Sequence, residues 1–143
     1  MDFNKFEQKI GYIFIDKDIL QRALTRKALE NESKCRTQEN LSTLGDGLLR
    51  AILVDSLMPS YDSSGEITKK KIELEKNQTL SELGKKWLLD EYVITTLGEK
   101  KDQSGKNSRI ADTVEAIIGA IYQDGGYEIA KKVVQNWYKE IDK

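Results

Sequence analysis

The sequence predicts an all-α protein with a single domain over residues 1–143, and three observations support this fold class. Helix-forming residues dominate, proline occurs once, and β-branched residues rarely alternate with polar ones as a surface strand requires. Apolar residues recur three and four positions apart along most of the chain. A length of 143 residues suits one hydrophobic core and is short for a catalytic domain plus an appended binding module.

The individual helices follow from these apolar repeats and from capping residues. We expect helices over about 3–10, 17–30, 38–57, 66–76, 79–89, 108–123 and 126–141. Asp16 is a candidate cap for the second helix, and Pro59 ends the third. Thr79 and Glu82 form a capping-box pair at the start of the fifth. Residues 92–96 are β-branched but few, so we expect an extended connector there.

The composition excludes several kinds of chemistry. The chain has no histidine, which rules out imidazole bases, Ser-His and Cys-His nucleophile pairs, and histidine metal sites. Cys35 is the only cysteine, so an internal disulfide and a thiolate zinc site are excluded and a reducing compartment is favoured. No apolar run approaches membrane-spanning length. We therefore expect a soluble cytoplasmic protein without a membrane partner, whose chemistry uses carboxylates, lysines or hydroxyls.

The charge distribution is compatible with a nucleic-acid partner without requiring one. The chain has 23 basic and 24 acidic residues, for a net charge of −1. Basic residues concentrate in its middle third, at Lys69, Lys70, Lys71, Lys76, Lys85, Lys86, Lys100, Lys101, Lys106 and Arg109. Of these, Lys69, Lys70, Lys71 and Lys106 are the candidates for binding RNA phosphates, and a solvated helix face is the alternative explanation.

An acidic pair lies on the helix predicted over 108–123. The apolar residues of this helix, at Ile110, Val114, Ile117, Ile118 and Ile121, have the spacing of one helical face. Asp112 and Glu115 are one turn apart on a neighbouring stripe. Two like charges beside a core are costly, and a divalent metal ion would offset them. The alternative is that both acids mark the solvated side of an amphipathic helix.

A second acidic segment lies in the helix predicted over 38–57. Its polar face, opposite the leucines, comprises Glu39, Ser42 or Thr43, Asp46 and Arg50. Gly45 and Gly47 flank Asp46, and each costs about 1 kcal/mol in a helix relative to alanine, so we expect a close backbone approach there. Gly119 offers a matching small surface, and a helix crossing would bring Asp46 to the acid pair described above. Three carboxylates suit a hard cation, unless the glycines serve packing alone and Asp46 is incidental.

Both acidic segments resemble the ribonuclease III family. Residues 38–49 resemble the family signature Asn-Glu-Arg-Leu-Glu-Phe-Leu-Gly-Asp, and residues 111–122 followed by Asp124-Gly125-Gly126 match its second acidic helix. Weaker matches occur in the same order at residues 10–14, 20–25, 77–83 and 136–138. The resemblance thus covers nearly the whole chain, and a chance match to both acidic helices together is improbable.

The resemblance implies an all-helical endonuclease domain, usually a homodimer, that cleaves both strands of double-stranded RNA with Mg²⁺, or with Mn²⁺ in its place. In the family, acids at the positions of Asp46, Asp112 and Glu115 help to bind the metal ion. Asp46 and Glu115 are therefore the expected catalytic residues, since the metal ion activates water and stabilises the departing oxygen. Lys106 matches a position that is commonly basic in the family and is a candidate contact for RNA phosphate.

The sequence departs from the family pattern at several positions. Ser42 replaces the second glutamate of the signature, and Thr43 replaces an aromatic residue that packs into the partner subunit. With Glu39, we expect these residues to support the site or the dimer contact. A further family acid falls at Ser64, with Asp62 and Glu66 nearby, and residues 25–28 read Thr-Arg-Lys-Ala where the family has Thr-His-Arg-Ser. No double-stranded-RNA-binding domain is evident after the last match, so an auxiliary RNA-binding protein is a candidate partner; the short Mini-III branch of the family also lacks that domain.

Two hypotheses therefore compete. In the first, the chain is a metal-dependent ribonuclease whose three remaining acids suffice. In the second, it is a catalytically degenerate module that keeps the fold to bind RNA or the ribosome, as the loss of the glutamate at Ser42 suggests. We favour the enzyme, because a fold kept only for binding has no reason to hold three buried like charges.

Overall fold

The secondary structure is helical throughout the described part of the chain, as the sequence predicts. The computed structural model describes residues 2–30 and 36–141. Cys35, the subject of the disulfide prediction, lies outside these ranges. The longer helices are α1 (Asn4–Ile10), α2 (Lys17–Leu24), α4 (Glu39–Leu57), α5 (Ser64–Glu75), α6 (Asn77–Lys86), α7 (Leu97–Lys101), α8 (Lys106–Gly125) and α9 (Tyr127–Ile141). Short 3-10 helices are η1 (Lys27–Leu29), η2 (Met58–Ser60) and η3 (Leu89–Glu91).

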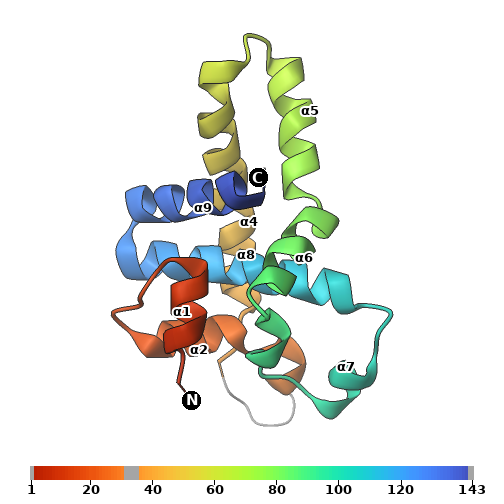
Figure 1. The fold of residues 1–143 in the computed structure, drawn as a ribbon. Helices are drawn as coiled ribbons and strands as arrows, with labels where there is room; N and C mark the ends of the chain where they lie inside the picture. The colour runs from red at the N-terminus through yellow and green to blue at the C-terminus, as the bar shows by residue number, and fades with distance from the viewer. Residues whose placement is uncertain (1, 31–35, 142–143) are drawn as a thin grey trace.

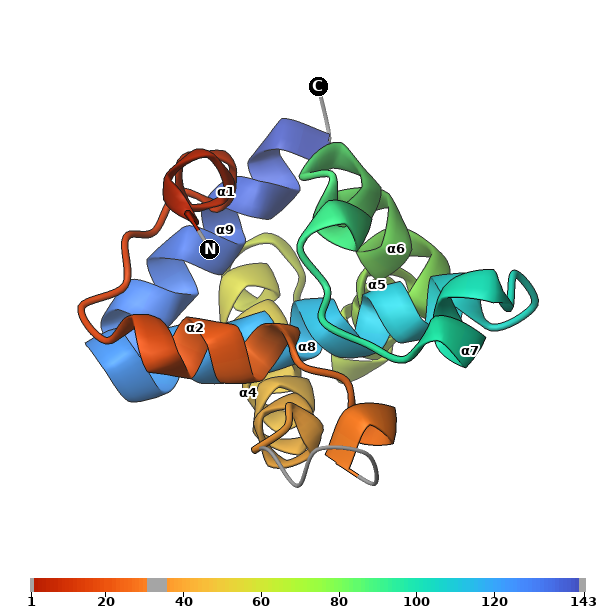
Figure 2. The same ribbon diagram turned by 90° about the horizontal axis from the view of Figure 1, so that it is seen from below.

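Helix α8 is the central element of the fold. It runs across the middle of the molecule and is crossed by α4, while α2, α6 and α9 pack against its other sides (Figure 1, Figure 2). Its predicted apolar face is buried at Ile110, Val114, Ile117, Ile118 and Ile121. The C-terminal end of α4 forms an antiparallel pair with α5 that projects from the body (Figure 1). Packing in the core therefore fixes the position of the middle of α4 relative to α8.

The second helix is shorter than the sequence predicts. It begins after Asp16, whose side chain accepts a hydrogen bond from the Asp18 backbone N–H as expected for a cap, but it ends at Leu24 instead of residue 30. At that point the backbone becomes extended, and Thr25 forms an isolated parallel bridge with Ile94. The predicted extended connector thus exists, and its pairing with Thr25 ends the helix early.

The starts of α5 and α6 also differ from prediction. Ser63 caps α5 by accepting a hydrogen bond from the Glu66 N–H and donating one to the Glu66 carboxylate, so α5 begins at Ser64 instead of 66. The capping box predicted at Thr79 is wrong, because α6 begins two residues earlier and the Thr79 hydroxyl donates to the Glu73 carbonyl oxygen. The sequence contained the N-cap of α5 in Ser63, followed three residues later by Glu66.

Two further features near the middle of the chain were not predicted. Leu88 has a left-handed backbone with φ of 55°, which ends the helical path after α6. Helix α7 is a five-residue segment capped by Thr96, whose hydroxyl accepts from the Glu99 N–H.

Within the ranges described, no helix is both long and apolar enough to span a lipid bilayer.

Candidate carboxylate site at a helix crossing

Helices α4 and α8 cross with their backbones in direct contact at two glycines. A Cβ atom added to Gly45 would lie 1.6 Å from the backbone oxygen of Glu115, and one added to Gly119 would lie 2.3 Å from the backbone oxygen of Leu41. No side chain fits at either position, because real Cβ atoms do not approach other atoms this closely. The crossing predicted from Gly45 and Gly119 is therefore correct, and it brings Asp46 beside Glu115.

Gly47 does not take part in the crossing. A Cβ atom there would meet nothing within 4 Å, so the prediction of a close backbone approach is right for Gly45 and wrong for Gly47. Gly47 and Thr43 are instead exposed, one turn apart on the same stripe of α4. The surface of α4 beside Asp46 is therefore accessible to another molecule.

Asp46 and Glu115 form a carboxylate pair at the edge of the crossing. The main effect on Glu115 is burial, which raises its pKa to about 8 together with a hydrogen bond to Asp46. The negative charges of Asp46 and Asp112 raise this pKa further, and the positive charge of Arg50 opposes the shift. At neutral pH one proton is thus held between the two carboxylates, because two adjacent negative charges are unfavourable without a cation.

Asp112 faces a different partner. Its carboxylate lies 3.5 Å from the Arg26 guanidinium, and burial raises its pKa while the charge of Arg26 opposes the shift. The side chains of Asp46 and Asp112 are each 47% exposed. The sequence-based expectation that all three carboxylates are buried is therefore wrong for these two. Across the ranges the structure describes, no group of three or more Asp, Glu, Cys or His side chains is compact enough to hold a metal ion. Two of the three predicted acids come together, with the third nearby.

The three residues predicted to support the site lie along the first turns of α4. The Ser42 hydroxyl donates a 3.0 Å hydrogen bond to the backbone oxygen of Asp112, which ties α4 to α8 at the crossing. The Thr43 hydroxyl donates to the Glu39 backbone oxygen at 3.3 Å. The Glu39 carboxylate forms an ion pair with Lys27 at 2.8 Å. Ser42 thus contributes a helix contact where the resembled family has a carboxylate.

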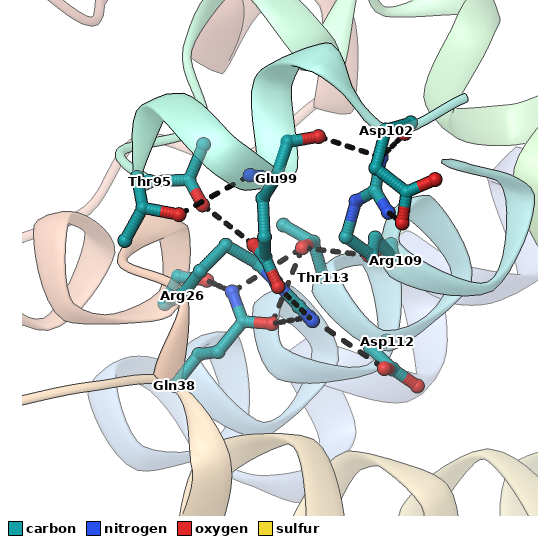
Figure 3. Close-up of polar contacts among 10 residues, drawn as sticks. Arg26, Gln38, Thr95, Glu99, Asp102, Arg109, Asp112 and Thr113 are labelled. Atoms are coloured by element: carbon teal, nitrogen blue, oxygen red, sulfur yellow. Dashed lines mark hydrogen bonds and ion pairs between the residues drawn. The ribbon is translucent and has the colours of Figure 1, made fainter. Parts of the chain in front are cut away.

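A polar network, which sequence reasoning missed, orients Arg26 (Figure 3). Arg26 donates to both carboxylate oxygens of Glu99, at 3.1 and 3.3 Å, and to the side-chain oxygen of Gln38 at 2.9 Å. Gln38 is buried and donates to the Ala23 backbone oxygen at 2.8 Å. The Thr95 hydroxyl donates to Glu99 at 2.5 Å. These contacts hold the guanidinium against Asp112, as Figure 3 shows.

The network lines a cavity of about 270 Å³ between α7, η3 and the start of α8. Burial alone would raise the pKa of Glu99, but hydrogen bonds from Arg26 and Thr95 and the charges of Arg26 and Arg109 hold it below its ordinary value. Arg109 in turn donates to the backbone oxygens of Glu99 and Asp102. Arg26 and Gln38 lie in segments compared with the family and Arg109 lies in the basic cluster of the middle third, whereas no spacing rule pointed to Glu99.

The predicted RNA-binding lysines do not form one patch beside the carboxylate pair. Lys69 is exposed and Lys70 half-buried on α5, but Lys71 is turned toward Glu75, with its nitrogen 3.1 Å from that carboxylate. Lys106, at the start of α8, forms an ion pair with Asp90 at 3.5 Å. It precedes Glu115 by nine residues, or about 14 Å along the helix.

Comparison with known proteins extends these observations. The family model described as "Ribonuclease-III-like" matches residues 16–141. Ribonuclease 3 of Marinomonas sp. (strain MWYL1) is 33% identical over 141 residues, covering 96% of this chain and 60% of the relative. Ribonuclease 3 of Aliivibrio fischeri is 36% identical over 138 residues, covering 94% and 60%. The chain therefore spans about 60% of the length of these curated relatives.

Two solved structures of the nuclease domain of ribonuclease III from Campylobacter jejuni are similar to this fold. Both are 29% identical to this chain and cover 97% of it, with TM-scores of 0.89 and 0.88 and coverage of 97% and 95% of those chains. One of them is described by structural flexibility in a region involved in dimer formation. The match lies in the nuclease domain, which confirms the resemblance inferred from the two acidic helices.

Proposed function

Because this chain belongs to the ribonuclease-III-like family, we propose that it is a metal-dependent endoribonuclease that hydrolyses phosphodiester bonds of double-stranded RNA. The observation that supports this most strongly is the Asp46–Glu115 pair at the glycine crossing. A rigid backbone contact holds two carboxylates together although one of them must keep a proton to stay there. Fully ionised, such a pair destabilises the fold, whereas it offers a divalent cation two oxygen ligands.

The donor set fits Mg²⁺, or Mn²⁺ in its place. Both ions prefer oxygen ligands, and Asp46 and Glu115 would hold the ion, with Asp112 near enough to influence Glu115 electrostatically. A bound divalent ion supplies an activated water and offsets negative charge on a phosphodiester. Glu115 must lose its proton to act as a ligand, so ion binding releases a proton and strengthens as the pH rises toward 8. Arg26 orients Asp112, which it holds at 3.5 Å.

We also propose that the protein acts as a homodimer through the exposed stripe of α4 that contains Thr43 and Gly47. Both residues are exposed beside the carboxylate pair, and a similar nuclease domain has a region involved in dimer formation. Thr43 supplies less apolar area than an aromatic residue, so the dimer should be weaker than one with an aromatic there. The auxiliary RNA-binding protein and the cytoplasmic location stay predictions from the sequence.

The second candidate function is a catalytically degenerate RNA-binding or ribosome-associated module. Two observations favour it: Ser42 bonds to the helix backbone where the family has a carboxylate, and Asp112 faces Arg26 instead of joining the pair. The two functions share a fold and differ in whether the carboxylate pair binds a metal ion that acts on RNA.

Cleavage of long duplex RNA tests the proposal directly. We expect cleavage that requires Mg²⁺ in wild type and is abolished in Glu115→Gln, which removes a metal-binding charge and nearly preserves shape. Glu128→Gln is the matched control, because Glu128 is exposed on α9, and it should cleave like wild type. Duplex binding by Glu115→Gln should be retained. An inert wild type that still binds RNA would favour the degenerate module.

A further inference from the structure

Arg50 lies one turn after Asp46 on α4, at the rim of the carboxylate pair. One terminal nitrogen of its guanidinium is 3.5 Å from the Asp46 carboxylate, and Nε is 3.7 Å from the Glu75 carboxylate. Both distances are at or beyond the limit of a hydrogen bond. The side chain is 58% exposed. Arg50 is thus attracted to two carboxylates while its N–H groups remain available to another acceptor.

Glu75, at the end of α5, is the more constrained of the two partners. Its side chain is 18% exposed, and Oε1 is 3.1 Å from the Lys71 nitrogen. Its other oxygen, Oε2, is buried and has no hydrogen-bond donor within the described part of the chain. A buried carboxylate oxygen without a donor is unfavourable, and Nε of Arg50 is 3.7 Å from it. Glu75 therefore favours an Arg50 conformation in which Nε faces the protein.

Tyr138 of α9 packs against the end of α5 that carries Glu75. Tyr138 is buried on α9, and its hydroxyl donates to the Leu74 backbone oxygen at 2.7 Å. Its pKa is raised first by burial and then by the negative charges of Glu75 and Glu115. The charges of both carboxylates thus act on the same tyrosine, although Glu75 comes from the projecting helix and Glu115 from the centre of the fold.

An arginine whose Nε faces a fixed carboxylate presents its two terminal nitrogens as a fork. This fork matches two oxygens of a phosphate, which a lysine cannot contact in the same bidentate way. One terminal nitrogen of Arg50 lies 3.5 Å from the Asp46 carboxylate and the side chain is 58% exposed, so the fork is accessible where the proposed function requires an RNA phosphodiester. The sheltered Lys71 and the distant Lys106 are less suited to contact a phosphate there.

We propose that Arg50 binds a phosphate of the RNA strand beside the Asp46–Glu115 pair, and that Glu75 positions its guanidinium for this contact. This inference rests on the proposed function and assigns the pair a substrate-binding neighbour. Arg50 is the binding residue, and Glu75 acts only through it. The alternative is that the Arg50–Glu75 contact serves only to hold α4 against α5.

Duplex binding without cleavage separates these roles. We would measure the affinity of a fluorescently labelled RNA duplex in EDTA over a series of salt concentrations, for wild type and Arg50→Ala. Arg50→Ala should weaken binding about tenfold, as for a lost hydrogen bond to a charged group, and lower the slope of log affinity against log salt by about one. Arg50→Lys should restore the slope but only part of the affinity, because a lysine keeps the charge and loses the fork.

Lys86→Ala is the matched control, because Lys86 is similarly exposed and forms a 3.2 Å ion pair with Glu140 away from the carboxylate pair. It should bind duplex like wild type. Equal affinities and equal slopes for Arg50→Ala and Lys86→Ala would overturn the proposal.

A double-mutant cycle tests the positioning role of Glu75. Glu75→Ala, and Glu75→Gln as the variant of unchanged size, should weaken binding in wild type and have no effect in the Arg50→Ala background. If the Glu75 substitutions weaken binding equally in wild type and in the Arg50→Ala background, Glu75 acts on stability instead of through Arg50. A wild type that neither binds nor cleaves duplex RNA would refute the proposed function itself. A wild type that cleaves while Arg50→Ala binds equally well would refute only this inference.

Discussion

Glu115 and Asp112 are one turn apart on the same helix, yet their surroundings are opposite in charge. Glu115 faces another carboxylate, Asp46, and its pKa is raised to about 8. Asp112 faces Arg26, which Glu99 and Gln38 hold in place. The comparison teaches that spacing along a helix predicts which acids are neighbours, but the elements packed against each acid determine its charge state. Glu115, for which no ion pair is formed within the described part of the chain, is the acid of α8 that we propose to bind a metal ion.

The largest effect should come from breaking the crossing that creates the carboxylate pair. Gly45→Ala places a Cβ atom 1.6 Å from the Glu115 backbone oxygen, which only movement of a helix can relieve. We expect a loss of at least about 3 kcal/mol in the free energy of unfolding, measured by urea denaturation. Gly47→Ala is the control, since its Cβ meets nothing within 4 Å, and it should stabilise the helix by about 0.5–1 kcal/mol. Equal effects of the two substitutions would contradict the crossing.

The next effect concerns the pH dependence of stability without metal ions. The pKa of Glu115 is raised from 4.5 to about 8 on folding. Its contribution to the free energy of unfolding is therefore fully present below pH 4.5 and is lost as the pH rises through 8. Allowing for solvent screening of this half-buried group, we expect wild type to lose roughly 2 kcal/mol between pH 5 and pH 9 relative to Glu115→Gln. Urea denaturation of both proteins in EDTA measures it. Parallel pH curves would show that Glu115 is not the responsible group.

Metal affinity should distinguish the two acids of α8. Glu115→Gln removes an expected ligand and should abolish Mg²⁺ binding measured by titration calorimetry. Asp112→Asn should weaken it about 10- to 100-fold, as for a residue that supports the ligands. An Asp112→Asn protein as defective as Glu115→Gln would mean that Asp112 leaves Arg26 and joins the ligands directly.

The smallest effect should come from adding the missing carboxylate. Ser42→Glu places an acid one turn before Asp46 and should raise Mg²⁺ affinity or cleavage several-fold, while the loss of the Ser42 hydrogen bond costs about 1 kcal/mol of stability. Ser42→Gln, which has the size of glutamate without its charge, is the control for the metal effect. If both variants change metal affinity alike, the effect comes from packing and not from the added charge.

Local patterns predicted most of this fold and half of the site. The apolar face of α8 and the glycines at 45 and 119 were sufficient to predict the crossing, because small residues at helical spacing permit backbone contact. The Arg26–Glu99 pair joins residues far apart in the sequence and depends on the bridge of Thr25 to Ile94, which no periodicity reveals. The Arg50–Glu75 contact depends likewise on how α5 returns along α4.

The central claim is that the Asp46–Glu115 pair exchanges its shared proton for a divalent ion. Titration calorimetry of Mg²⁺ into the metal-free protein at pH 7, in two buffers of different ionisation enthalpy, measures both the binding and the protons released. A Glu115 pKa of about 8 predicts the release of close to one proton per ion in wild type and no binding to Glu115→Gln. Absence of Mg²⁺ binding by wild type, or binding without proton release, would contradict the account.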